Sequence, residues 1–249
     1  MKWTLFVAIL SLVAAPAFAG ENVTYTSGGK AYEGYMAKAK GSSKGLVLVI
    51  HDWDGLDGYE MKRADMLANM GYDAFAADLY GKGNRPKETN MKKAETKKLY
   101  TDHELMRTLI LAGLAEARRQ GGAADAVVMG YCFGGAAVLE LARSGKGNAE
   151  RVKGYATFHG GLSTPEGQGY SADTAPILVA HGAADTSIKM SHVAALSEEL
   201  EKAKVNYEIQ VYSGAPHAFT VFGSKRYRKV ADEQSWDAFG DFLKDNLGR

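Results

Sequence analysis

The fold is decided by one stretch of sequence, AVVMGYCFGGAAVLEL at residues 126–141. Its first four residues are apolar and predict a buried strand, and its last six predict a helix. Between them lies Gly-Tyr-Cys-Phe-Gly-Gly, a sharp turn in which glycines tolerate a strained backbone and close packing. Cys132 lies at the tip of this turn, where the N–H groups of the following helix favour a thiolate. We therefore expect Cys132 to be a nucleophile.

Cys132 is also the only cysteine of the chain, so it cannot form an internal disulfide. Exported proteins commonly use cysteines in pairs, and a lone thiol in an oxidising compartment is open to damage. Its place within the turn favours a chemical role. The alternative is a buried core cysteine, which packs as a small apolar side chain.

Residues 1–19 predict a secretory signal peptide. Lys2 supplies the positive start, residues 5–15 are the apolar segment, and Ala17-Phe18-Ala19 is a cleavage site. A membrane anchor is the weaker alternative, because the apolar run is shorter than the ~20 residues that span a bilayer and Pro16 interrupts it. We expect a bacterial periplasmic or secreted protein, with residues 20–249 as a single domain and no stable membrane anchor after cleavage.

Composition excludes one class of partner. The chain has a formal net charge of +1, and Lys2 is the only charged residue of the predicted signal peptide, so the mature chain is formally neutral. Neutrality gives no electrostatic reason to bind nucleic acid. Hydrophobic residues make up 46% of the sequence, which is enough for a substantial core. We expect a monomer that binds a small molecule.

Strand-like and helix-like segments alternate through the rest of the chain. The predicted strands are Val23–Thr26, Ala31–Ala37, Gly45–Ile50, Asp73–Ala77, Asp125–Met129, Val152–Phe158, Ile177–Ala180 and Tyr207–Tyr212. The predicted helices are Tyr59–Met70, Asp102–Gln120, Ala136–Leu141, Met190–Lys204 and Lys229–Leu247. The first two strands form a hairpin, and the alternation that follows predicts an α/β fold with a mostly parallel sheet covered on both faces.

Two further residues follow strands in the order that a catalytic triad requires. Asp185 comes after the strand at 177–180, and His217 comes after the strand at 207–212. Ligands of such sheets bind at the carboxyl ends of the strands, so Cys132, Asp185 and His217 are expected to meet there. Taken singly, Asp185 is compatible with a turn or helix cap, and His217 with an ordinary loop residue.

A thiolate that attacks a carbonyl also needs donors for the oxyanion. We expect the backbone N–H groups of Phe133, next to the nucleophile, and of Trp53, in the loop after the strand at 45–50, to supply them.

These motifs resemble those of the dienelactone hydrolase family of α/β-hydrolases, which use a Cys-His-Asp triad. The resemblance extends from about Val23 to Leu247 and is carried by Gly130–Gly135, Asp78-Leu79-Tyr80, Phe158–Gly161, His181-Gly182 with Asp185, and Pro216–Phe219. It implies hydrolysis of an ester or lactone through an acyl-enzyme, without metal or organic cofactor.

The resemblance also implies roles at positions where this sequence departs from the family. The family places a glutamate after the third strand; Asp52 stands there and is expected to lie near the thiol and modulate its ionisation. Two arginines bind the substrate carboxylate in the family, and Lys82 and Val221 occupy their positions. Arg85, Lys225 or Arg226 are the nearby cations that can take over, and Lys82 and Arg85 are the candidate substrate-binding residues.

Three alternatives stay open. The strand-end histidines at 51, 159 and 181 are compatible with a zinc site, although their spacing favours simple hydrogen bonding. The basic stretch at 82–98 is either solvated surface or a flap over the site. A periplasmic thiol protein with a redox or binding role is the rival to a cysteine-dependent hydrolase, and a cysteine peptidase ranks last.

Overall fold

The computed structural model describes residues 19–248, which contain one eight-stranded sheet. The strands are β1 (Glu21–Ser27), β2 (Lys30–Ala37), β3 (Leu46–Ile50), β4 (Asp73–Ala77), β5 (Ala126–Tyr131), β6 (Val152–Phe158), β7 (Ile177–Gly182) and β8 (Tyr207–Tyr212). The helices are α1 (Gly58–Asn69), α2 (Thr89–Thr101), α3 (His103–Arg119), α4 (Phe133–Arg143), α5 (Lys146–Ala149), α6 (Met190–Ala203) and α7 (Lys229–Leu247). Most of the predicted signal peptide, residues 1–18, lies outside the described residues, and export stays a prediction.

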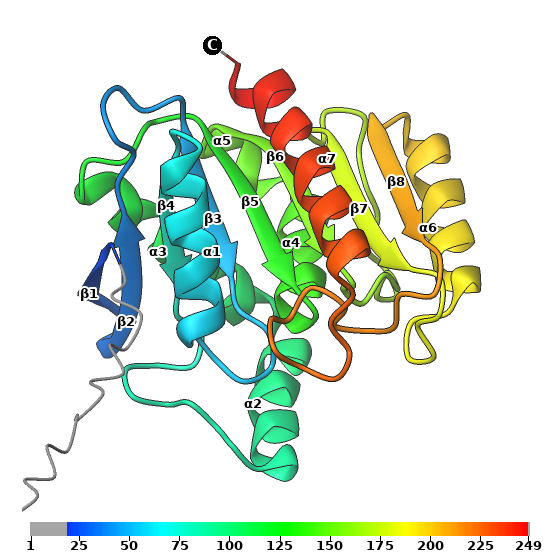
Figure 1. Cartoon of the computed structure of the whole chain (residues 1–249), viewed down its shortest axis with the longest axis horizontal. Helices are drawn as coiled ribbons and strands as arrows, with labels where there is room; N and C mark the ends of the chain where they lie inside the picture. Colours follow the sequence, from blue (N-terminus) through cyan, green and yellow to red (C-terminus); the bar gives the residue numbers. More distant parts are fainter. Residues whose placement is uncertain (1–18, 249) are drawn as a thin grey trace, which may run out of the picture.

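The sheet is antiparallel at one edge and parallel over the remainder. Its order is β1-β2-β4-β3-β5-β6-β7-β8; β1 and β2 form the predicted hairpin, β2 pairs antiparallel with β4, and every later pair is parallel. The prediction of an α/β fold with a mostly parallel sheet is therefore confirmed. Figure 1 shows the carboxyl ends of the parallel strands at the lower edge, where α2 projects.

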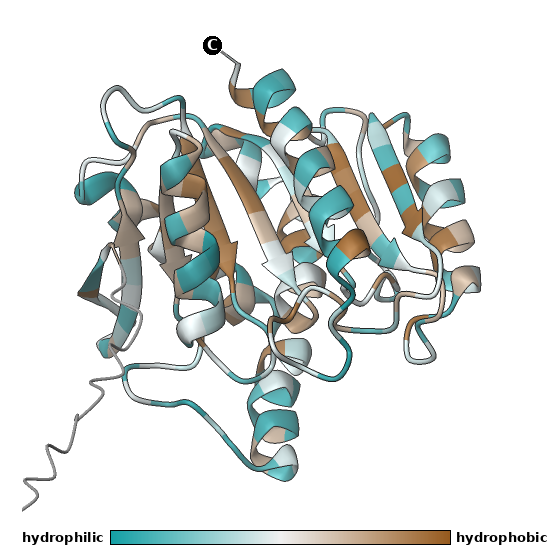
Figure 2. Ribbon diagram, in the orientation of Figure 1, coloured by the Kyte–Doolittle hydropathy of each residue, from teal (hydrophilic) through white to brown (hydrophobic). Residues whose placement is uncertain are grey.

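Alternate residues of the central strands face two separate halves of the core. In β3, Leu46, Leu48 and Ile50 pack on the side of α3, α4 and α6, while Val47 and Val49 pack on the side of α1 and α7. All five side chains are fully buried, and each contributes about 1.5–3 kcal/mol by leaving water. Figure 2 shows the result, with brown strands between helices that carry teal on their outer faces. A strand buried on both faces is a continuous apolar run, which is why β3 could be recognised.

The helix α2 was not predicted, and it occupies much of the basic stretch at 82–98. Leu99 is its only buried residue, so α2 presents no apolar stripe of helical period. It is anchored at both ends instead. Lys92 pairs with Asp54 at 2.6 Å and lies over the ring of Trp53, while the Tyr100 ring lies 5.4 Å from that of Phe133. Most of the basic stretch is solvated surface, as the first alternative expected, because its exposed residues include Lys82, Lys87, Lys93, Lys97 and Lys98. It carries a helix that is docked beside the strand ends.

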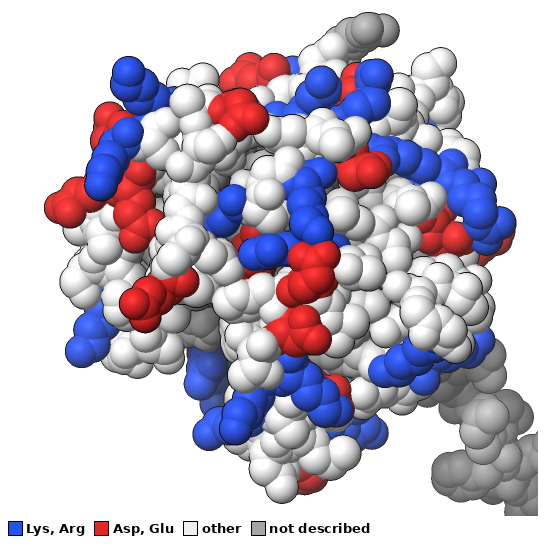
Figure 3. Space-filling view, turned by 180° about the vertical axis from the view of Figure 1, so that it is seen from behind, with Lys and Arg blue, Asp and Glu red and all other residues white. Residues whose placement is uncertain are grey.

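The surface carries charges of both signs. Figure 3 shows lysines and arginines interspersed with acidic residues over the rear face, as expected for a chain with a formal net charge of +1. Within residues 19–248, no helix is long and apolar enough to cross a membrane.

Candidate active site

Cys132 occupies a strained turn between β5 and α4. Its backbone has φ 52° and ψ −110°, in the region that favours glycine, and such a conformation costs about 1–3 kcal/mol. The Cys132 N–H donates to the carbonyl of Phe158 at 3.0 Å, and its own carbonyl accepts the first helical bond, from Ala136 at 3.2 Å. These hydrogen bonds hold the strained backbone conformation, and the half-buried thiol lies at the N-terminus of α4.

The glycines around Cys132 are required by close packing. A Cβ on Gly130 would overlap the backbone of Gly134, and a Cβ on Gly134 would overlap the carbonyl oxygens of Ile50 and His51. The start of α4 is thereby pressed against the end of β3. This contact brings the loop that begins at His51 to the side of the turn.

The three predicted triad residues meet as expected from their order along the chain. Nε2 of His217 lies 3.1 Å from Sγ of Cys132, and Nδ1 of His217 lies 2.8 Å from Oδ2 of Asp185. The histidine thus bridges the thiol and the carboxylate, and each ring nitrogen has one partner. The geometry allows His217 to exchange a proton with the sulfur while Asp185 fixes the orientation of the ring.

The loops that carry Asp185 and His217 are tied to each other. Ala184 donates its N–H to the carbonyl of Ala215 at 3.0 Å, and the second oxygen of Asp185 accepts the N–H groups of Ser187 at 2.8 Å and Ile188 at 2.9 Å. Backbone N–H groups therefore hold the carboxylate of Asp185 in place independently of its contact with His217.

The electrostatics of the triad favour a charged histidine. Burial alone would lower the pKa of His217, but the hydrogen bonds to Asp185 and Cys132 outweigh it and raise this pKa to about 10. Burial would raise the pKa of Asp185, but His217 and the N–H groups of Ile188 and Ser187 hold it below its ordinary value. The charged ring of His217 thus lies between the carboxylate of Asp185 and the sulfur of Cys132.

A buried network that no sequence pattern predicted supports the histidine loop. The hydroxyl of Thr220 lies 2.8 Å from Nε2 of His159 and 2.7 Å from the hydroxyl of Tyr59. The carbonyl of Thr220 accepts a hydrogen bond from Arg63 at 2.9 Å. The ring of His159 packs at 5.3 Å from that of His217. Thr220 lies three residues beyond His217, so these contacts fix the loop that carries it.

Arg63 is fully buried, which is unusual for a charged side chain. It forms an ion pair with Asp232 of α7 and lies over several aromatic rings, 4.2 Å from that of Phe222 and 4.9 Å from that of Trp236. It therefore joins α1, α7 and the histidine loop. No pattern in the sequence distinguishes this arginine from a surface one.

The two candidate oxyanion donors come from the start of α4 and from the loop after β3. Phe133 is the first residue of α4, and the first N–H groups of a helix have no partner within it. The Trp53 carbonyl accepts the hydroxyl of Tyr80 at 3.3 Å, and its ring is covered by Lys92. These contacts order the loop that carries the Trp53 N–H.

Asp52 lies in the same loop. Its carboxylate accepts the N–H of Asp54 at 2.8 Å, and its own N–H donates to the buried Glu60 at 3.2 Å. Burial raises the pKa of Asp52 to about 7; the Asp54 N–H opposes this rise, and the charges of Asp54 and Asp57 add to it. Asp52 is therefore poised to change its charge near neutral pH.

The two candidate substrate-binding cations are engaged elsewhere. Lys82 binds the hydroxyl of Thr24 at 2.7 Å and pairs with Glu33 at 3.1 Å, both on the hairpin. The guanidinium of Arg85 contacts Asp78 at 3.3 Å and the carbonyl of Asn84 at 2.9 Å. Neither has a hydrogen bond to a triad residue, so the expectation that they face the substrate gains no support from their contacts.

The strand-end histidines do not form a metal cluster. Among the described residues, no group of three or more histidine, cysteine, aspartate or glutamate side chains could hold a metal ion. His51 donates from Nδ1 to the carbonyl of Asp52 at 2.6 Å, and its Nε2 accepts the N–H of Leu79 at 3.1 Å. His159 contacts Thr220 as described above, and burial lowers the pKa of His181. His51 and His159 therefore form hydrogen bonds, as the second alternative for the strand-end histidines expected.

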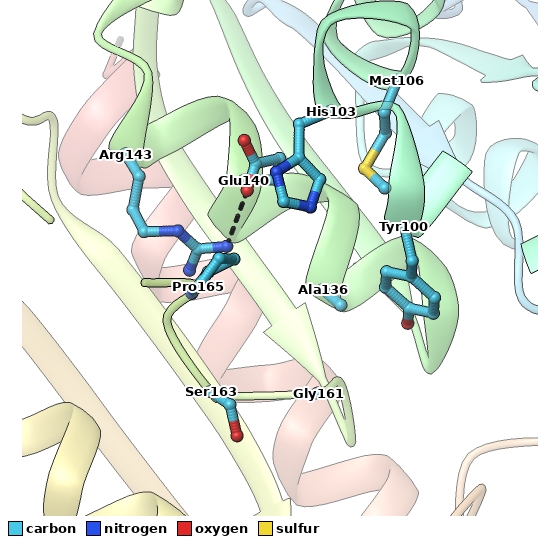
Figure 4. A pocket seen from close by; sticks show the side chains of 9 residues that line it. All are labelled: Tyr100, His103, Met106, Ala136, Glu140, Arg143, Gly161, Ser163 and Pro165. Carbon is cyan, nitrogen blue, oxygen red and sulfur yellow. Dashed lines mark hydrogen bonds and ion pairs between the residues drawn. The ribbon is translucent and has the colours of Figure 1, made fainter. Parts of the chain in front are cut away.

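A cavity of about 250 Å³ opens between the end of α2, α3, α4 and the loop after β6 (Figure 4). It is lined by Tyr100, His103, Met106, Ala136, Glu140, Arg143, Gly161, Ser163 and Pro165. This volume is just below the usual range of small-molecule pockets, about 300–1,000 Å³. The cavity therefore suits a small ligand.

The profile of the dienelactone hydrolase family matches residues 32–247 of this chain. A Yersinia pestis protein named as a carboxymethylenebutenolidase is 25% identical over 208 residues, covering 80% of this chain and 77% of the relative. A protein of Bradyrhizobium sp named as a 2-oxo-3-(5-oxofuran-2-ylidene)propanoate lactonase is 26% identical, covering 77% of this chain and 79% of the relative. The crystal structure of a dienelactone hydrolase-like promiscuous phosphotriesterase from metagenomic libraries superposes with a TM-score of 0.81 at 27% identity, covering 91% of this chain and 98% of that one.

Proposed function

The chain belongs to the dienelactone hydrolase family, and we propose that it hydrolyses esters or lactones of small molecules through Cys132 as the nucleophile. Hydrolysis of these bonds follows from the family and from the names of its relatives. The assignment of the nucleophile rests on one observation: His217 bridges Cys132 and Asp185 at 3.1 Å and 2.8 Å.

The proposed reaction has two halves. The Cys132 thiolate attacks the carbonyl carbon, and the N–H groups of Phe133 and Trp53 stabilise the oxyanion, each donor being worth about 3 kcal/mol. The C–O bond then breaks, and the His217 imidazolium gives its proton to the leaving alkoxide. The product of this half is a thioester on Cys132.

Water completes the cycle. Neutral His217 removes a proton from a water molecule, which attacks the thioester carbonyl. The C–S bond breaks, the acid is released, and the proton on His217 restores the ion pair with the thiolate. Asp185 stays ionised throughout and holds the ring. Each proton taken up is given back, so the cycle needs no cofactor.

Three further assignments are part of the proposal. Asp52 would modulate the thiol, because it shares the loop of Trp53 and titrates near neutral pH. Residues 1–19 would direct export to the periplasm or medium, which N-terminal sequencing of the extracellular or periplasmic protein tests. The mature chain, residues 20–249, would act as a single-domain monomer, which light scattering tests.

The direct test is hydrolysis of 4-nitrophenyl acetate and butyrate by the mature protein, beside Cys132→Ala and with a dienelactone as third substrate. We expect activity on the simple esters that Cys132→Ala abolishes. Absence of hydrolysis by a folded protein with a reduced thiol would contradict the proposal. It would favour a thiol redox or binding role instead. That role is disfavoured because it does not need an ordered Asp-His pair.

A further inference from the structure

The loop after β3 is rich in acidic residues. Together with the first turn of α1 it contains four carboxyl groups, those of Asp52, Asp54, Asp57 and Glu60. The same loop carries the N–H group of Trp53, one of the two proposed oxyanion donors. Stabilisation of an oxyanion depends on the charges around its donors, and carboxylates oppose it. A cation beside this loop would offset them.

Lys92 of α2 is the cation that pairs with these carboxyl groups. Its Nζ lies 2.6 Å from Oδ1 of Asp54, and within residues 19–248 no other lysine or arginine forms an ion pair with any of the four. Oδ1 of Asp54 is buried and has no hydrogen-bond partner. A buried charged oxygen without a partner is costly, so the Lys92 ammonium is the group that compensates it.

Lys92 also contacts the residue that carries the donor. Its ammonium lies 5.3 Å from the centre of the Trp53 ring, and because the lysine side chain is only 16% exposed, this cation–π attraction is stronger than one in open solvent. The Asp54 N–H binds the carboxylate of Asp52 at 2.8 Å, and the Trp53 carbonyl accepts the hydroxyl of Tyr80 at 3.3 Å. Lys92 therefore joins two consecutive residues of a short segment that is otherwise held by single hydrogen bonds.

The helix that carries Lys92 adds little to the core. Leu99 is the only buried residue of α2, and the helix projects from the edge where the parallel strands end (Figure 1). Near its other end the ring of Tyr100 lies 5.4 Å from that of Phe133. The two ends of α2 thus contact Trp53 and Phe133, the two residues whose N–H groups are the proposed oxyanion donors.

We propose that α2 braces the oxyanion hole and that Lys92 is a positioning residue for the Trp53 N–H group. The inference rests on the proposed function for the role of that group. Lys92 acts through Trp53 and Asp54 rather than on the reacting atoms: it fixes the loop and offsets the charge of its carboxylates. Its loss should therefore weaken binding of the transition state and leave binding of the substrate nearly unchanged.

Steady-state kinetics with 4-nitrophenyl butyrate test the inference. Lys92→Met removes the ammonium and keeps an unbranched side chain. It should lower kcat about tenfold or more, since complete loss of an oxyanion donor costs about 10²–10³. KM should stay within about twofold, the pattern of an interaction made only in the transition state. Lys92→Arg keeps the charge and should retain most of the activity. Lys93→Met is the control and should leave both constants unchanged, because Lys93 is exposed on the same helix and forms no ion pair within residues 19–248.

A transition-state analogue reports on the oxyanion hole directly. The Cys132 thiolate adds to the carbonyl carbon of an alkyl trifluoromethyl ketone, the C–S bond forms, and the carbonyl electron pair moves to the oxygen as an oxyanion. The inhibition constant of this ketone should rise in Lys92→Met by about the factor by which kcat falls.

A second pair of variants keeps the test decisive if Lys92→Met does not fold. Asp54→Asn is compared with Asp54→Asn combined with Lys92→Met, in which no charge is left unpaired. The combined variant should still have the lower kcat, because Trp53 has lost its cation. Unchanged kinetics on loss of Lys92, a rise in KM without a fall in kcat, or an equal loss in Lys93→Met would overturn the inference. Absence of ester hydrolysis in the unsubstituted protein would instead contradict the proposed function.

Discussion

Nδ1 of His217 lies 2.8 Å from Oδ2 of Asp185, whose other oxygen is held by two backbone N–H groups. The backbone thus holds the carboxylate of Asp185 in place. The carboxylate in turn orients the ring of His217 and stabilises its charged form. The raised pKa of His217, about 10, is the electrostatic consequence.

Asp185→Asn should lower that pKa toward the ordinary value of a histidine, about 6.5. The imidazolium, which persists below pH ~10 in the unsubstituted protein, would then be lost at lower pH. We expect kcat/KM to fall by about 10²-fold or more and its alkaline limb to move to lower pH, which a pH–rate profile measures. An alkaline limb that stays in place would show that Asp185 does not set the charge of His217.

Thr220→Val should slow the reaction although Thr220 does not touch the reacting atoms. The change keeps the shape of the side chain but leaves the His159 nitrogen and the Tyr59 hydroxyl without their partner, which costs about 1–3 kcal/mol of stability. We expect kcat to fall with KM nearly unchanged, and Thr220→Ser to restore it.

The matched control for this change is Thr26→Val, on the exposed face of β1. A loss of stability without a change in kcat would mean that Thr220 supports only the fold, and not the position of His217.

Gly134→Ala should damage the turn itself. The added methyl group would overlap the carbonyl oxygens at the end of β3, and overpacking of this kind typically costs about 1–3 kcal/mol. Thermal unfolding should occur at a lower temperature, and esterase activity should fall. Gly169→Ala, where a methyl group meets nothing within 4 Å, is the control and should change neither. Equal behaviour of the two variants would refute the packing argument.

Asp52→Asn should stabilise the protein more at alkaline than at acid pH. The pKa of Asp52 is about 7 in the folded chain, above the ordinary 3.8, so folding favours the protonated form. Stability is therefore lost as pH rises from about 4 to about 7, and asparagine removes this loss while still accepting the Asp54 N–H. Melting temperatures at about pH 4.5 and about pH 8 measure the effect. A difference between variant and parent that is the same at both values would contradict it; the exposed Glu166→Gln serves as control.

The sequence predicted those features that a local pattern encodes. The apolar run of β3, the glycine-flanked cysteine after β5, and the aspartate and histidine after β7 and β8 each carry a signature within a few residues. Their meeting at one edge follows from the parallel sheet, in which all strand ends share that edge. The fold class, and the meeting of Cys132, Asp185 and His217, could be predicted for this reason.

Other features depend on contacts between distant segments. Arg63 belongs to the site only because α1 packs against α7 and the histidine loop, and Thr220 only because His159 and Tyr59 reach it. The helix α2 buries a single side chain and is docked through Lys92 and Tyr100, so its sequence shows no apolar pattern of helical period. The position of Lys82 in the sequence predicted contact with substrate, but the side chain contacts Thr24 and Glu33 of the hairpin.

The most direct measurement is to trap the acyl-enzyme. The mature protein is mixed with 4-nitrophenyl acetate, quenched with acid within the first turnover, and mapped by peptide mass spectrometry. The account predicts one acetyl group on the peptide that contains Cys132, accumulating to a higher level in His217→Ala if the thioester still forms there, and absent from Cys132→Ala. Hydrolysis at the unsubstituted rate by Cys132→Ala, or an acetyl group on another residue that turns over at the catalytic rate, would contradict it.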